Sequence, residues 1–201
     1  MSNRAARTPS SRTRRAPRAS PARERILATA AKLFYERGVQ AVGINEIIER
    51  SGVAKMSLYN NFDSKDALIV AYLRARHESW SAWLHAAVPA NAAPRRRILA
   101  VFDALTEWCA RDDFRGCAFL NTAAAICNPR HPVRAVCLEH KVWLRAYLQS
   151  LTAGGGVGDP AALAFQLVLL IDGAIAWAVL EGSSEPMVRA KAAAATLLKS
   201  A

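Results

Sequence analysis

The stretch VGINEIIERSGVAKMSLYNNFDSK, residues 42–65, determines how the rest of the chain is organised. Within it, Ile44, Ile47 and Ile48 recur at the i, i+3, i+4 spacing, which gives a first short helix one apolar face. Gly52 follows where this helix must end, because a glycine after a helix adopts the left-handed conformation at low cost. The pattern therefore predicts a short helix followed by a tight turn.

Residues 54–62 predict a second short helix, whose apolar face carries Leu58 and Phe62 at the i, i+4 spacing. Its opposite face carries Lys55, Met56, Ser57, Tyr59, Asn60 and Asn61. Two short helices joined by a tight turn form a helix-turn-helix, whose second helix lies in the major groove of DNA. The sequence thus predicts a DNA-binding head.

The same run resembles the DNA-binding head of the tetracycline-repressor (TetR) family. The matching positions keep the family's spacing without an insertion, and they are Gly38-Val39, Ile44, Glu46-Ile47, Ser51-Gly52-Val53-Ala54, Leu58-Tyr59, Asn61-Phe62 and Ser64-Lys65. The resemblance implies an all-α chain of about nine helices, with a three-helix helix-turn-helix head before a helical ligand-binding and dimerisation domain. It also implies a ligand-responsive transcriptional regulator, foremost a repressor that a small molecule releases from a palindromic operator in double-stranded DNA.

The resemblance further implies which residues contact DNA, namely Gly43, Asn45, Lys55, Met56, Ser57, Tyr59, Asn60, Asn61 and Lys65. Four residues depart from the family's usual pattern. Val42-Gly43 replaces Thr-Thr, Met56 replaces Gly, and Asn61 replaces His or Tyr. Gly43 remains an acceptable helix N-cap, and Glu46 at the third helical position is expected to reach back to its N–H as half of a capping box.

The net charge of +11 is unevenly distributed, because residues 1–20 hold six arginines and no acidic residue. A basic arm beside a helix-turn-helix is suited to binding DNA phosphates. A solvated, disordered tail has the same composition, so both interpretations stay open. We expect a disordered basic tail over residues 1–19, the DNA-binding domain over 20–64 and the ligand-binding and dimerisation domain over 65–201.

Ser20-Pro21 predicts the start of the first helix, because a serine N-cap is followed by proline at the first helical position. Gly38 predicts its end. A long helix is expected over residues 65–87. Because it begins at the DNA-binding head and runs into the next domain, we expect it to transmit movements between the two domains. Further helices are expected over residues 95–111, 117–127, 131–151, 161–180 and 184–199.

The segment 161–180 is apolar nearly all round and long enough to span a membrane. However, Asp172 lies in its middle, where a carboxylate costs about 2.5–3.5 kcal/mol. A helix with apolar faces all round can instead be buried by its own subunit on one side and a partner on the other. Since the family resemblance implies a dimer formed by the last two helices, we expect a cytoplasmic homodimer and no membrane contact.

The sequence contains no Gly-x-Ser-x-Gly, no His-Glu-x-x-His and no Walker loop, so we expect no catalytic residues and no enzyme activity. We also expect no cofactor and no metal, since the cysteines contain no C-x-x-C pair. They are Cys109, Cys117, Cys127 and Cys137. Packing as small apolar residues is the usual role of free cysteines, and a redox role stays an open alternative.

Aromatic residues are concentrated in the C-terminal helices, and aromatic walls with a few polar groups are typical of small-molecule pockets. We expect a ligand cavity formed by Trp83, Phe102, Trp108, Phe119, Asn121, His140, Trp143 and Trp177. Asp172 is a further polar candidate. The alternative to a repressor is an all-α small-molecule binding protein or enzyme whose head no longer binds DNA.

Overall fold

The computed structural model describes residues 20–154 and 156–200, and this part of the chain contains helices and no strand. The all-α prediction is confirmed, whereas the predicted disordered tail, 1–19, lies outside the described residues. The helices are α1 (Pro21–Arg37), α2 (Ile44–Ser51), α3 (Lys55–Asn61), α4 (Lys65–Ala87), α5 (Pro94–Cys109), α6 (Ala118–Ala125), α7 (Pro132–Ala153), α8 (Pro160–Glu181) and α9 (Glu185–Ser200).

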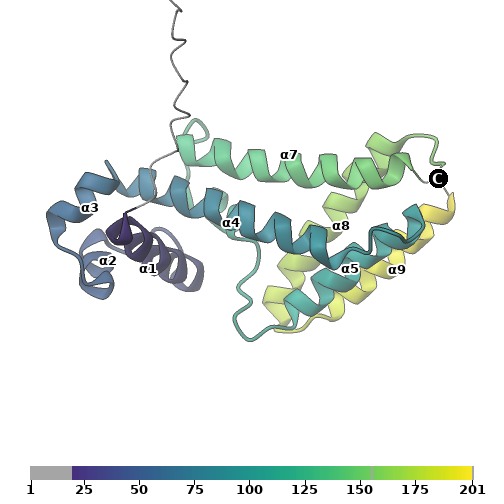
Figure 1. The fold of residues 1–201 in the computed structure, drawn as a ribbon. Helices are drawn as coiled ribbons and strands as arrows, with labels where there is room; N and C mark the ends of the chain where they lie inside the picture. Colours follow the sequence, from purple (N-terminus) through teal and green to yellow (C-terminus); the bar gives the residue numbers. More distant parts are fainter. Residues whose placement is uncertain (1–19, 155, 201) are drawn as a thin grey trace, which may run out of the picture.

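Helices α1, α2 and α3 form a small head at one end of the molecule, on the left in Figure 1. Their amphipathic faces meet in one core, to which α1 contributes Ile26 and Leu33, α2 contributes Ile47, and α3 contributes Leu58. All four are at most 2% exposed. The helix-turn-helix predicted from the isoleucine spacing is therefore present, and its second helix is one residue shorter at each end than expected.

Local signals explain where the head's helices begin and end. The Ser20 side chain accepts a hydrogen bond from Arg23 N, and Pro21 opens α1 as predicted. Gly52 ends α2 in the left-handed region, with φ of 64°, as predicted. The predicted half capping box at α2 is wrong, because Glu46 pairs with Arg37 and Arg50 and not with the Gly43 N–H.

Helix α4 has 23 residues, which makes it about 35 Å long, and it connects the head to the rest of the molecule. The Ser64 side chain caps its first turn by accepting from Ala67 N. Its first half packs on α1, and it also packs against α5 and α7. Figure 1 shows it leaving the head and running alongside α7. Its bounds agree with the prediction.

Helices α5 to α9 form the body, in which α7 packs on α8, α8 on α9 and α5 on α9. Helix α8 is long and apolar enough to cross a membrane by length and composition. One of its faces is buried inside the chain, including Leu167 and Ile171 at 0% exposure. Its other face is also apolar but exposed, with Leu169 at 57% and Trp177 at 58%. The chain alone thus covers only half of this helix.

Candidate DNA-reading face and ligand cavity

Helix α3 presents an exposed face opposite the buried Leu58. Lys55, Tyr59 and Asn60 are exposed on it, and Met56 is 68% exposed although its side chain is apolar. Ser57 is half-buried. Among residues 20–154 and 156–200, nothing covers the Met56 side chain. The major groove of DNA would offer contacts to such a surface, because it contains both polar base edges and thymine methyls.

Two neighbouring helix starts flank this face. Gly43 and Asn45 are exposed at the start of α2, where no side chain caps the free backbone N–H groups. Lys65 is the first residue of α4, and burial lowers the pKa of its ammonium group. Its Nζ lies 3.5 Å from Gln40 O. Uncapped N–H groups and a lysine are groups that bind phosphate.

Asn61 differs from the other predicted DNA contacts, because its carboxamide is already used inside the head. Its Oδ1 accepts a hydrogen bond from Ser20 Oγ at 2.9 Å, and its Nδ2 donates to Ser57 O at 2.7 Å. Asn61 therefore ties the end of α3 to the start of α1. Its predicted contact with DNA stays a prediction.

A cluster of aromatic rings occupies the region between α4, α5, α6 and α7. Its members are Trp80 and Trp83 of α4, Trp108 of α5, Phe119 of α6, and His140 and Trp143 of α7. The tightest contact is the parallel stack of Phe119 on His140, with ring centroids 3.6 Å apart and planes 6° apart. The structure thus brings together five of the eight residues predicted for the ligand cavity.

The cavity inside this cluster is closed in the present conformation. Its volume is about 20 Å³, which holds no more than about one water molecule. Phe119 and His140 line it together with Trp80, Trp108 and aliphatic residues of α7 and α8. A ligand of the size of even one aromatic ring can therefore enter only if a lining side chain moves.

His140 is the most buried polar group of the cavity, at 3% exposure. Burial lowers its pKa to about 3, with smaller contributions from Lys141, His77 and Arg76. Its Nδ1 lies 3.0 Å from Nδ1 of His77, so one of the two nitrogens must donate and the other accept. At neutral pH the His140 ring is neutral, and it offers the cavity a flat polar surface without charge.

Of the eight predicted residues, Trp108, Phe119 and His140 line the cavity, whereas Trp83 and Trp143 belong to the surrounding aromatic cluster without lining it. The other three lie elsewhere. Phe102 is fully buried in the core and does not line the cavity. Asn121 is exposed, and its Nδ2 donates to Arg115 O at 2.8 Å, which closes the α5–α6 loop. Trp177 lines a surface groove between α8 and α9. The sequence marks each as aromatic or polar but does not show which face of the helix meets the body.

Sequence reasoning also missed several residues at the cavity. His77 precedes Trp80 by three positions on α4, so their shared helical face was a signal that could have identified it. Arg76 and Lys141 line the cavity as well. Asp172, a polar candidate from the sequence, pairs with Lys141, with Nζ and Oδ1 2.5 Å apart.

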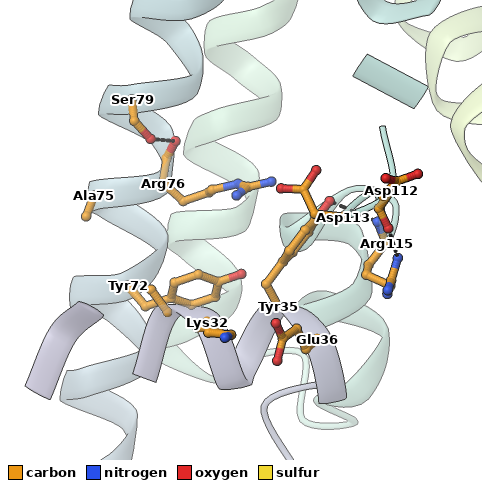
Figure 2. Close-up of a pocket in the computed structure, with 11 residues that line it drawn as sticks. Lys32, Tyr35, Glu36, Tyr72, Ala75, Arg76, Ser79, Asp112, Asp113 and Arg115 are labelled. Atoms are coloured by element: carbon orange, nitrogen blue, oxygen red, sulfur yellow. Dashed lines mark hydrogen bonds between the residues drawn. The ribbon is translucent and has the colours of Figure 1, made fainter. Parts of the chain in front are cut away.

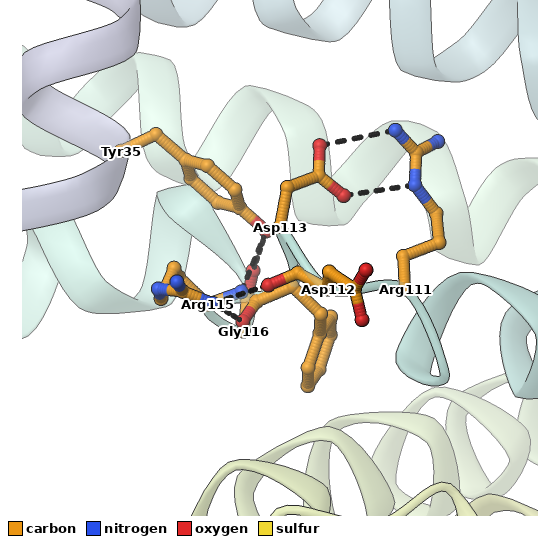
Figure 3. A network of polar contacts seen from close by, with 7 residues as sticks. Tyr35, Arg111, Asp112, Asp113, Arg115 and Gly116 are labelled. Atoms are coloured by element: carbon orange, nitrogen blue, oxygen red, sulfur yellow. Dashed lines mark hydrogen bonds and ion pairs between the residues drawn. The ribbon is translucent and has the colours of Figure 1, made fainter.

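A contact between the head and the body lies beside the cavity, which we call the Tyr35 latch (Figure 3). The Tyr35 hydroxyl of α1 donates to Gly116 O at 3.2 Å and accepts from Arg115 N at 3.0 Å. Gly116 has φ of 81°, and a Cβ there would lie 2.9 Å from the Val179 side chain, so only glycine fits. The next helix, α6, carries Phe119 into the cavity.

Cys109 and Cys137 are two of the chain's four cysteines, and both are buried thiols. Burial raises the pKa of Cys109 to about 12 and that of Cys137 to about 11, so both remain protonated at neutral pH. Cys117 is also buried, whereas Cys127 is exposed. Within the described residues, no group of three or more His, Cys, Asp or Glu side chains is placed to hold a metal ion.

Comparisons with known proteins agree with this geometry. Residues 26–72 match the family model for bacterial regulatory proteins of the tetR family, and residues 94–194 match the tetracyclin repressor-like C-terminal domain. The HTH-type transcriptional repressor NemR of Escherichia coli is 28% identical over 179 residues, covering 85% of this chain and 90% of NemR. The HTH-type transcriptional regulator LmrA of Bacillus subtilis is 28% identical over 181 residues, covering 88% and 96%.

Solved structures give the same result. A TetR-family transcriptional regulator from Streptomyces coelicolor superposes with a TM-score of 0.81 at 35% identity, covering 88% of this chain and 95% of that one. The reduced form of Escherichia coli NemR superposes with a TM-score of 0.75 at 27% identity, covering 86% and 95%. The helix-turn-helix head, the helical body and these matches together show that the chain belongs to the TetR family of transcriptional regulators.

Proposed function

We propose that the protein is a cytoplasmic, homodimeric repressor that binds a palindromic operator and leaves it when a small molecule enters the aromatic cavity. The observation that carries this proposal is that helix α4 contributes residues to both the DNA-reading face and the aromatic cluster. Its first residue, Lys65, borders the DNA-reading face, and Trp80 and Trp83 further along the same helix belong to the aromatic cluster. One rigid element therefore touches both sites. The repressor NemR, to which the chain is similar, supports repression.

The head's exposed residues divide into two roles in this proposal. Lys55, Met56, Ser57 and Asn60 face bases, because they occupy the outer surface of α3, which lies in the major groove. Tyr59, Asn61 and Lys65, together with Gly43 and Asn45 at the start of α2, position the head on the phosphate backbone. Phosphate contacts fix the register without reading sequence.

The exposed face of α8 is assigned to a second copy of the chain. Phe165, Leu169 and Trp177 are each about half exposed or more, and Val188 of α9 is 45% exposed. Contiguous apolar surface of this kind marks an interaction site. A palindromic operator requires two heads related by a twofold axis. A dimer through this face would bury the apolar surface and also provide the two heads.

The test is retardation of DNA from the gene's own upstream region by the ligand-free protein. Specific retardation that fades with added salt is expected, because phosphate contacts release counterions. A matched duplex of scrambled sequence serves as the control. If the protein retards both duplexes equally or neither, the head does not read an operator and the alternative, a binding protein or enzyme with a non-functional head, holds. If the upstream duplex is retarded specifically, a genome-wide binding map identifies the regulated genes.

A further inference from the structure

The charged residues at the aromatic cavity have one sign. Its lining contains two charged side chains, the cations Arg76 and Lys141, and no carboxylate. Lys141 is neutralised by Asp172, whose Oδ1 lies 2.5 Å from its Nζ. His140 carries no charge at neutral pH, because burial holds its pKa at about 3. Arg76 is therefore the one cation of this lining that forms no ion pair with a carboxylate of the described residues.

Arg76 lies between the cavity and the Tyr35 latch. Its guanidinium carbon is 4.1 Å from the centroid of the Tyr35 ring, and it pairs with no carboxylate in the described part of the chain. Figure 2 shows the Asp113 carboxylate facing the Arg76 guanidinium, and both residues line a cleft of about 690 Å³. Both oxygens of Asp113 accept instead from Arg111, at 2.9 and 3.0 Å (Figure 3). Arg76 thus has hydrogen-bonding capacity that its stacking on Tyr35 does not use.

Phe119 shows what shape the cavity accepts. Its ring lies flat on His140, 3.6 Å away, and it fills the space so completely that about 20 Å³ remains. Trp80 and Trp108 complete the wall. A flat aromatic ring of a ligand would recover the same stacking contact if Phe119 moved aside, whereas a bulky aliphatic ligand would not.

We propose that the ligand is a planar aromatic carboxylate, whose ring replaces Phe119 against His140 and whose carboxylate binds Arg76. This inference rests on the proposed function and names the ligand class of the same cavity. A guanidinium matches a carboxylate with two parallel N–H···O bonds, which is the geometry that distinguishes Arg from Lys. An anionic group is favoured over a cationic one next to Arg76, because this lining contains two cations and no carboxylate among the described residues.

The same ligand would also release the Tyr35 latch. Its carboxylate draws Arg76 away from the Tyr35 ring, and its aromatic ring displaces Phe119. Phe119 lies only three residues after Gly116, whose carbonyl oxygen accepts a hydrogen bond from the Tyr35 hydroxyl. Both movements therefore act on the contact through which the body holds α1. A neutral aromatic ligand would supply only the second of them.

The experiment compares three probes that share one ring system and differ in charge. Calorimetric titrations of the wild-type protein use 2-naphthoate, 2-naphthamide and 2-naphthyltrimethylammonium. We expect 2-naphthoate to bind at least about tenfold more tightly than the amide, the scale of one charge-assisted hydrogen bond. We expect the cation to bind more weakly than both. Equal affinities, tighter binding of the cation, or no binding of 2-naphthoate would overturn the inference.

Variants then assign the effect to Arg76. Arg76→Gln should abolish the preference for 2-naphthoate over the amide, and Arg76→Lys should retain part of it. Arg74→Gln, an exposed arginine of the same helix outside the cavity lining, is the matched control and should keep the full preference. An unchanged preference in Arg76→Gln would contradict the assignment. Operator retardation without ligand is measured in parallel, so failure of DNA binding is separable from failure of the ligand class.

Discussion

At the scale of single residues, Met56 is the side chain on which the proposed base reading can be tested most directly. It replaces the family's usual glycine and is 68% exposed on the outer face of α3. We expect Met56→Gly to change the preferred base at one position in each half-site, because a thymine methyl would lose its apolar contact. Selection from randomised duplexes measures the preference. Met56→Ala controls for glycine's cost in a helix, about 1 kcal/mol, and an unaltered preference in both variants would show that Met56 does not face a base.

His140 gives a pH-dependent stability whose sign follows from its burial. Its folded pKa is about 3, below the ordinary value of 6.5, so the unfolded chain takes up a proton first as the pH falls. Stability is therefore lost from about pH 6.5 downward. Between pH 7 and pH 5 this amounts to about 2 kcal/mol.

Urea unfolding of the wild type and of His140→Gln at both pH values tests this expectation. The wild type should lose about 2 kcal/mol more than the variant between pH 7 and pH 5. Since the carboxylates and the other histidines are common to both proteins, the difference isolates His140. Parallel losses in the two proteins would show that His140 is protonated in the folded state or exposed to water.

Residue roles were predictable from the sequence only where the role is local. The outer face of α3 follows from the i, i+4 spacing of Leu58 and Phe62, which fixes what points away from the core. Asn121 and Trp177 were placed wrongly, because their surroundings depend on how distant helices pack. The role of Arg76 was not predictable, because it depends on neighbours that are distant in the sequence, Tyr35 of α1 and His140 of α7.

At the scale of helices, ends and lengths were predictable because caps act within a few residues. The Asp159 side chain caps α8 by accepting from Ala161 N and Ala162 N, and Pro160 follows at the first position, as the sequence indicates. The predicted ends of α5 and α6 were one or two residues too long, since no strong cap marks them. The pair of Glu46 with Arg50 follows from the i,i+4 spacing within α2, whereas its pair with Arg37 was not predictable, because Arg37 lies on another helix.

Helix α8 carries the prediction about assembly. Phe165, Leu169, Gly173 and Ala176 follow one another at helical spacing along its exposed stripe. We expect Ala176→Arg to yield monomers that keep a folded head but lose at least about tenfold in operator affinity, because a charge would be buried against the partner copy. Analytical ultracentrifugation measures the assembly. Ala86→Arg, an exposed alanine on α4, is the matched control, and a dimeric Ala176→Arg would move the interface off this face.

At the scale of the whole molecule, repression depends on the distance between two heads, which must lie about 34–36 Å apart or a multiple of it to reach successive major grooves. Within one chain, α1 is held to the body by the Tyr35 latch, and α4 is tied to the start of α7 by Asp66 and His131, 3.2 Å apart. A ligand can change the spacing only if it binds the two arrangements with different affinity. The Tyr35 latch would make the two arrangements differ in energy, because a movement of α6 would displace Gly116, to which the Tyr35 hydroxyl is bonded.

Tyr35→Phe tests this coupling without any ligand, because it removes both hydrogen bonds of the latch and keeps the ring beneath Arg76. Two hydrogen bonds contribute about 1 kcal/mol each, so operator affinity should fall by up to about 30-fold. Coupling is reciprocal, and operator DNA should therefore alter the environment of the cavity tryptophans in the wild type but much less in this variant. Acrylamide quenching measures this in a Trp177→Phe background, where the other four tryptophans all belong to the aromatic cluster.

Tyr72→Phe, which removes a hydroxyl from the lining of the same cleft, separates loss of the latch from loss of a phenol. It should respond to operator DNA as the wild type does. If Tyr35→Phe also kept the wild-type operator affinity and quenching response, the body would control the head through α4 alone. The ion pair of Asp66 and His131, which ties α4 to the start of α7, would then be the contact to remove, and Asp66→Asn would be the variant that uncouples the two sites.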